Sequence, residues 1–162
     1  MLQYGTQDKQ FKRLLDEVER LIKSGRITDT VIAQIGNTKF TTDLPNSKMQ
    51  LIDFTTPKEM DTLIENADFI ITHGGVATII KGVNIGKKII AVPRLKKYRE
   101  HVNDHQLQII ENFSQSGYII GTKGVGDIED ALDKIKNFIP KKYKSNNEVF
   151  VDRLKNTIIS FN

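Results

Sequence analysis

Cysteine is absent from the 162 residues of this sequence, and long apolar runs are absent with it. Without cysteine there is no disulfide framework, no thiolate nucleophile and no cysteine-ligated zinc. No stretch reaches the roughly 18 apolar residues that a membrane-spanning helix requires. The opening residues MLQYGTQDKQ also lack the basic and apolar regions of a secretory signal. The sequence therefore predicts a cytoplasmic protein that does not itself cross a membrane.

A large excess of charge of one sign is also missing. The 24 lysines and arginines exceed the 20 acidic residues only slightly, giving a formal net charge of +4. This excess is too small to predict a nucleic-acid partner. The basic residues do gather in three runs, which are Lys87–Lys88, Arg94–Arg99 and Lys141–Lys144. Each run is either a solvated loop or helix end, or a patch that faces anionic lipid or a phosphorylated ligand.

Short apolar runs rich in β-branched residues alternate with helical patterns. This order is typical of βαβ units and a parallel sheet. The predicted strands are Leu2–Tyr4, Thr30–Ile35, Met49–Phe54, Phe69–Thr72, Lys88–Val92 and Tyr118–Ile120. Two of them, Phe69–Thr72 and Ile89–Val92, are almost continuously apolar, as central strands buried on both faces should be. The predicted fold is an α/β domain with a Rossmann-like open parallel sheet and helices on both faces.

Helical spacing of apolar residues appears between these strands, over residues 11–22 and 107–113. Gly25 and Gly117 stand where helix C-terminal caps are expected, and Pro57 suits the first turn of another helix. We expect a single domain over residues 1–162. Its last segment, 148–162, has an apolar stripe at helical spacing. This predicted terminal helix either packs on its own domain or docks on a partner subunit.

Two glycine turns follow predicted strands. Ligands of open parallel sheets bind beyond the carboxyl ends of strands, where both His73-Gly74-Gly75 and the loop after Pro93 lie. Glycines let the backbone approach a ligand, and the free N–H groups that open the next helix favour phosphate. The turn Gly5-Thr6-Gln7, after the first strand, strengthens a diphosphate interpretation. The alternatives are a plain tight turn at 74–75 and helix capping by Asp8.

The stretch from His73 to Gln106 resembles the donor-sugar signature of GT-B glycosyltransferases, in particular glycosyltransferase family 28 C-terminal domains. The run GTQDKQFKRLL is similar to the opening loop and helix of the small single-domain members. These members are the catalytic subunit of the eukaryotic dolichol-linked N-acetylglucosaminyltransferase and its bacterial capsule and exopolysaccharide counterparts. The run VPRLKKYREHVNDHQ resembles the bacterial branch. The resemblance extends from Gly5 to about Lys136 and implies the C-terminal, donor-binding half of a GT-B enzyme.

That resemblance also implies the site residues. The predicted donor-binding residues are Gly5, Thr6, Gln7, His73, Gly74, Gly75, Val76, Thr78, Asn103, Asp104 and Gln106. Those from Gly74 to Thr78 would surround the diphosphate, whereas Asp104 and Gln106 would hold sugar hydroxyls with help from Asn103. For Asn103 and Asp104 the alternative is capping of the helix that begins near Asn103. His73 is either a catalytic residue or a buried, satisfied histidine.

One position departs from the family pattern. Relatives carry a glutamate that binds the ribose hydroxyls where this chain has Lys81. Lysine has no acceptor, so nucleoside recognition must differ here, or Lys81 approaches a phosphate. We expect no metal site, because the histidines and carboxylates lack the usual ligand spacing, and no cofactor beyond the UDP-sugar substrate.

The function that follows is the donor-binding catalytic subunit of a two-component UDP-sugar transferase. It would transfer a hexose-type sugar to a lipid-diphosphate-linked saccharide in capsule or exopolysaccharide biosynthesis. A membrane-anchored acceptor-side subunit would supply the general base and hold the chain at the inner membrane face. The alternative is a non-catalytic nucleotide-binding or regulatory module. An epimerase of this architecture is expected to need both halves in one chain, and no FMN loop or phosphoacceptor cluster is visible.

Overall fold

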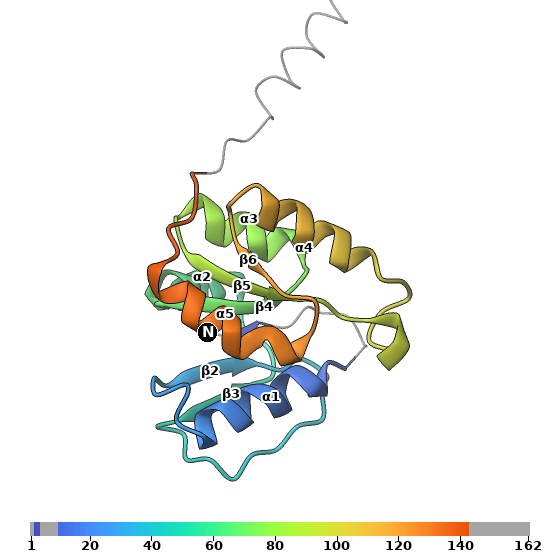
Figure 1. Ribbon diagram of the computed structural model, residues 1–162. Coiled ribbons are helices and arrows are strands. Elements are labelled where there is room, and N and C mark those ends of the chain that lie inside the picture. Colours follow the sequence, from blue (N-terminus) through green and yellow to red (C-terminus); the bar gives the residue numbers. More distant parts are fainter. Residues whose placement is uncertain (1, 4–9, 143–162) are drawn as a thin grey trace, which may run out of the picture.

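The computed structural model describes residues 2–3 and 10–142 (Figure 1). Within these ranges the chain forms one six-stranded sheet in which every strand pair is parallel. The strands are β1 Leu2–Gln3, β2 Val31–Gln34, β3 Met49–Ile52, β4 Phe69–His73, β5 Lys88–Val92 and β6 Ile120–Gly121. The predicted strands are confirmed, with ends that shift by one or two residues. The turn at 5–7 and the terminal helix over 148–162 lie outside the described residues.

The helices are α1 Lys12–Lys23, α2 Pro57–Asn66, α3 Val76–Asn84, α4 His105–Gln115 and α5 Ile128–Asn137, with short 3-10 helices η1 Lys96–Tyr98 and η2 Val125–Asp127. Their ends follow local chemistry. Gly25 and Gly117 take positive φ, +75° and +77°, just after α1 and α4, which confirms the predicted glycine caps. Pro57 opens α2 as predicted. Within the described residues, no helix has the length and apolarity needed to span a bilayer.

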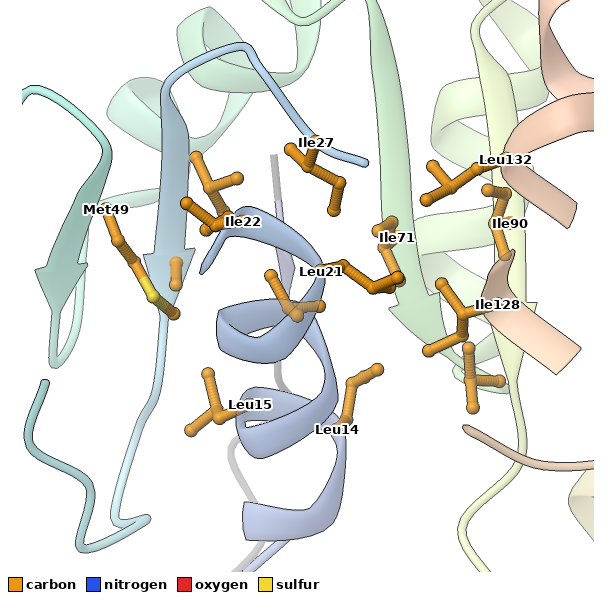
Figure 2. Close-up of a cluster of buried hydrophobic side chains, with 14 of the residues drawn as sticks. Leu14, Leu15, Leu21, Ile22, Ile27, Met49, Ile71, Ile90, Ile128 and Leu132 are labelled. Atoms are coloured by element: carbon orange, nitrogen blue, oxygen red, sulfur yellow. The ribbon is translucent and has the colours of Figure 1, made fainter. Parts of the chain in front are cut away.

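Helices cover both faces of the sheet, and each face has its own core. On one face, side chains of α1 and α5 pack against the strands, as Figure 2 shows for Leu14, Leu21 and Ile128. On the other face, α2, α3 and α4 contribute Ile64, Ile79, Val83 and Ile110. Successive side chains of a strand point to opposite faces. Accordingly Ile70 and Ile89 join the second core, while Ile71 and Ile90 join the first. The predicted two-sided α/β architecture is confirmed.

The strand order is β3-β2-β1-β4-β5-β6. The chain builds outward from β1 to β3 and then returns to place β4 on the other side of β1. The order therefore reverses between β1 and β4. In open parallel sheets this reversal separates the loops at the carboxyl ends of the two central strands and leaves a crevice for ligands. The loop after β4 is the one that carries Gly74 and Gly75.

Candidate functional site

The turn between β4 and α3 stands at the reversal of strand order. Strand β4 ends at His73, which is buried at 8% exposure, and α3 begins three residues later. The N–H of Gly75 donates to the carbonyl oxygen of His73 at 2.7 Å, so the turn is tight. Helix α3 is therefore aimed with its N-terminal end at the carboxyl edge of the sheet.

Glycine is required in this turn by close packing. A Cβ on Gly75 would lie 2.8 Å from Nε2 of His73, and a Cβ on Gly74 would lie 3.0 Å from Cβ of Gln106. Gly75 has an ordinary φ of −74°, so any residue could adopt its backbone conformation. The two glycines thus let His73 and Gln106 come close to the turn. The structure thereby brings His73, Gly74, Gly75 and Gln106 together, as the sequence predicts.

The first turn of α3 presents backbone donors at this edge. Gly75 is the N-cap and has no side chain to occupy them. Val76 and Ala77 are exposed, while Thr78 is half-buried with its hydroxyl available as a further donor. Free N–H groups and the positive end of the helix dipole favour an anion there. This arrangement suits the predicted diphosphate contacts of Gly75, Val76 and Thr78.

The loop after β5 holds the second half of the site. Three successive backbone N–H groups in it each donate to a side chain. Arg94 donates to Oε1 of Gln106 at 2.9 Å, Leu95 to Oε2 of Glu100 at 3.1 Å, and Lys96 to Oδ1 of Asp104 at 2.8 Å. Side-chain acceptors thus fold the loop against the start of α4.

These bonds determine which atoms a ligand can use. Gln106 is buried, and its oxygen is engaged by Arg94, so its amide nitrogen is the group left to donate to a ligand oxygen. Asp104 is exposed and keeps its second oxygen, Oδ2, for a hydroxyl. A groove of about 740 Å³ opens beside Asp104, between α4 and the residues after β5 and β6, with Leu95, Leu107 and Thr122 in its walls. There is therefore room for a ligand next to this carboxylate.

Asn103 has a different local role. Its side-chain oxygen accepts the N–H of His105 at 3.2 Å, and it also contacts Nδ1 of His101 at 3.1 Å. It therefore caps the start of α4, which is the alternative that its sequence position left open. Asp104 makes no capping bond to this helix. The predicted sugar contact of Asn103 remains a prediction.

The burial and pairing of three charged residues in this region were not predicted from the sequence. Arg94 is 1% exposed and Glu100 is 4% exposed, although Arg94 begins the basic run Arg94–Arg99 and Glu100 directly follows it. Glu100 pairs with Arg13 of α1, which lies 87 positions earlier. The one feature of the sequence that could have indicated this pairing is a single acidic residue, Glu100, at the end of the basic run RLKKYRE.

Lys81, the departure from the family pattern, forms an ion pair with Asp61 of α2. Both side chains remain more than two-fifths exposed. The ammonium group thus has a neighbouring carboxylate, and its approach to a phosphate remains a prediction. Among the described residues, no three histidine or acidic side chains gather into a metal-binding group.

An open parallel sheet with a glycine turn and a helix N-terminus at the reversal of strand order is the arrangement that nucleotide-binding α/β domains use. The family follows from the sequence match. The model of the glycosyltransferase family 28 C-terminal domain matches residues 4–158, and the chain belongs to this family. The predicted family is thereby confirmed.

Two curated relatives are named UDP-N-acetylglucosamine transferase subunit ALG13. The protein from Candida glabrata is 31% identical over 96 residues, which cover 57% of this chain and 46% of the relative. The protein from Candida albicans is 31% identical over 75 residues, covering 46% of this chain and 24% of the relative. The matches thus span less than half the length of these curated relatives.

A solved structure supports the fold. The glycotransferase of kitacinnamycin matches 83% of this chain and 33% of its own, with a TM-score of 0.57 and 15% sequence identity. At this identity the likeness concerns the fold alone. It agrees with the predicted correspondence to one half of a GT-B glycosyltransferase.

Proposed function

We propose that this chain is the donor-binding subunit of a two-component glycosyltransferase that uses a UDP-sugar. The observation that carries the proposal is the meeting of the His73–Gly75 turn with Gln106 at the reversal of strand order. The family match adds weight, since relatives carry the name of a UDP-N-acetylglucosamine transferase subunit. A UDP-linked N-acetylhexosamine is accordingly the first donor to test among hexose-type sugars.

Each part of the site has a task in sugar transfer. The bond between the anomeric carbon and the diphosphate breaks, and the acceptor oxygen forms a new bond to that carbon on the opposite face. The first turn of α3 would stabilise the charge that develops on the departing diphosphate. Oδ2 of Asp104 would accept a sugar hydroxyl, and the amide nitrogen of Gln106 would donate to a sugar oxygen. His73, which lies against Gly75, would contact the diphosphate side.

The acceptor side of the reaction would come from a partner. A base must take the proton of the acceptor hydroxyl as the new bond forms. We assign this base, and the binding of a lipid-diphosphate-linked saccharide, to a membrane-anchored subunit that would keep this chain at the inner membrane face. Capsule or exopolysaccharide biosynthesis is the proposed process, because the run VPRLKKYREHVNDHQ resembles the bacterial branch of the family.

Calorimetric titration with UDP and with UDP-linked N-acetylglucosamine, glucose, galactose and glucuronate tests the donor site. Asp104→Ala and Gln106→Ala should weaken the binding of one UDP-sugar by about 10-fold or more, because a sugar hydroxyl loses its partner. The same substitutions should weaken the binding of UDP less. Gln108→Ala is the matched control, since Gln108 is an exposed glutamine on the same helix that contacts His105. Equal losses for UDP and the UDP-sugar would refute sugar recognition by these residues.

A nucleotide-binding module without catalysis is the competing function. It is favoured by the internal bonds of Asp104 and Gln106, since Oδ1 of Asp104 and Oε1 of Gln106 each already accept a backbone N–H. Sugar transfer to a lipid-linked acceptor, measured after the partner subunit is added, separates the two. Transfer that depends on both proteins supports the enzyme, whereas nucleotide binding without transfer supports the module.

A further inference from the structure

We propose that Glu100 and Arg13 are positioning residues of the donor site. Their ion pair would fix the loop after β5 on helix α1 and so hold Gln106 and Asp104 in place for the sugar. This inference rests on the proposed function. It assigns to the pair a role in ligand binding, although neither residue belongs to the predicted site.

Arg13 and Glu100 form a bidentate ion pair, called the clamp below, between α1 and the loop after β5. Nε of Arg13 donates to Oε1 of Glu100 at 3.0 Å, and Nη2 donates to Oε2 at 2.9 Å. Such bidentate arginine–carboxylate contacts fix orientation as well as distance. Glu100 is almost fully buried, and Arg13 is largely buried. A carboxylate removed from water in this way needs its partner, because an unpaired buried charge is strongly unfavourable.

The clamp connects directly to the backbone that holds the site. Oε2 of Glu100, which binds Arg13, also accepts the N–H of Leu95 at 3.1 Å. The flanking N–H groups belong to Arg94 and Lys96, and these donate to Gln106 and Asp104. Glu100 therefore anchors the middle of three successive amides whose outer members set the positions of the two proposed sugar-binding side chains. A loop released from α1 would let both side chains move.

Two aromatic rings lie next to the guanidinium of Arg13. The guanidinium of Arg13 lies 4.2 Å from the ring centre of Tyr98 and 5.4 Å from that of Phe11. The buried guanidinium of Arg94 lies 5.8 Å from the ring centre of Phe11. Phe11 is fully buried just before α1 and thus connects the two arginines. Arg13 is therefore connected to the loop in two ways, through Glu100 and through the ring of Phe11, which also contacts Arg94.

The backbone of the loop needs such support. Arg99, the residue before Glu100, has a φ of +58° and is the non-glycine residue with positive φ among those that the structure describes. This conformation is unfavourable for a residue with a side chain and persists where the surroundings hold it. The turn closes through Arg99 N–H to the carbonyl of Lys96 at 2.8 Å. Loss of the neighbouring clamp should allow this turn to relax.

The test compares Arg13→Lys with Arg20→Lys. Arg20 is a matched control because it lies on the same helix and makes a bidentate contact with Glu17. That contact lies on the exposed surface. Arg13→Lys keeps the positive charge and removes the bidentate contact with Glu100. We expect on the order of 10-fold weaker binding of the UDP-sugar, as for a small misplacement of binding groups. The Arg20→Lys control should bind like the parent protein.

Amide hydrogen exchange supplies a readout that does not need a nucleotide. The amides of Arg94, Leu95 and Lys96 should exchange faster in Arg13→Lys, while those of β4 and β5 should keep their protection. Glu100→Gln is the second variant, because its amide oxygen can still accept the Leu95 N–H while the charge that attracts Arg13 is lost. It should loosen the loop in the same direction.

The outcomes separate this inference from the proposed function. Faster loop exchange together with weaker sugar binding supports the positioning role. Unchanged exchange, or faster exchange with unchanged affinity, overturns it. If the parent protein binds no UDP-sugar even with its partner subunit, the proposed function fails and the positioning role for a sugar falls with it. Exchange at residues 94–96 would then show separately whether the clamp holds the loop.

Discussion

The imidazole of His73 lies in the space that a side chain at position 75 would need, since a Cβ on Gly75 would come within 2.8 Å of Nε2. The ring is buried at the end of β4, so it cannot swing freely into solvent. The same turn brings Gly74 against Gln106. One short glycine turn therefore sets the spacing between the end of β4, the start of α3 and the first turn of α4.

Gly75→Ala should destabilise the protein by about 1–3 kcal/mol, because the added methyl group overpacks the turn. Chemical denaturation of the single and double variants measures the coupling. In the His73→Ala background the same substitution should cost clearly less, since the colliding ring is gone. Costs that simply add would show that the methyl group conflicts with something other than His73.

Gly25→Ala should cost about 1 kcal/mol through backbone strain alone. Gly25 has a φ of +75° just after α1, and an added Cβ would meet nothing within 4 Å. Gly126 is the control, because it too has open space but lacks a positive φ. Gly126→Ala should be neutral or slightly stabilising. Equal effects in thermal unfolding would argue against strain at position 25.

The start of α2 should respond to acid. Glu59 accepts the backbone N–H of Thr56 at 2.9 Å and the hydroxyls of Thr55 and Thr56 at 2.8 Å. These bonds, the backbone one first, lower the pKa of Glu59 below its usual value of 4.5. A lowered folded-state pKa stabilises the protein above the unfolded pKa, and this contribution is lost as the pH falls through the folded value.

The free energy of unfolding of the parent protein should therefore exceed that of Glu59→Gln at neutral pH. The difference should shrink as the pH falls below about 4.5 and through the lowered folded-state pKa, where the carboxyl of the folded protein becomes protonated. Thr56→Ala should cost about 1 kcal/mol at neutral pH, because it removes the capping oxygen that accepts the Glu59 N–H. A difference between the parent and Glu59→Gln that stays constant across the pH range would contradict the lowered pKa.

Lys81→Gln should change stability by less than about 1 kcal/mol, since exposed ion pairs contribute little. Because the ammonium group pairs with Asp61, we expect UDP affinity to change by no more than roughly two-fold. Calorimetric titration with UDP checks this, with Lys58→Gln as a control on an exposed lysine of α2. A ten-fold loss would instead show that Lys81 approaches a phosphate in the bound state.

The local features of the fold could be predicted because local chemistry decides them. Strands β4 and β5 read as continuous apolar runs since helices cover both faces of the sheet. Gly25 and Gly117 mark helix ends through a positive φ that few other residues adopt. Pro57 marks the start of α2 because its fixed φ and missing N–H suit the first turn of a helix. The place of the His73–Gly75 turn could be predicted because the carboxyl ends of neighbouring parallel strands share one edge, and its role in a site stays a prediction.

What the sequence by itself determined was the order of strands and helices, their caps and the family to which the chain belongs. The tertiary structure decided the partners of the charged residues. Nothing local indicates that Arg13 meets Glu100 across 87 positions or that Glu100 anchors the amide of Leu95. The periodicity of a chain encodes which face of an element is buried. Ion pairing between distant segments depends on how the packed elements place their side chains, and only the folded structure shows it.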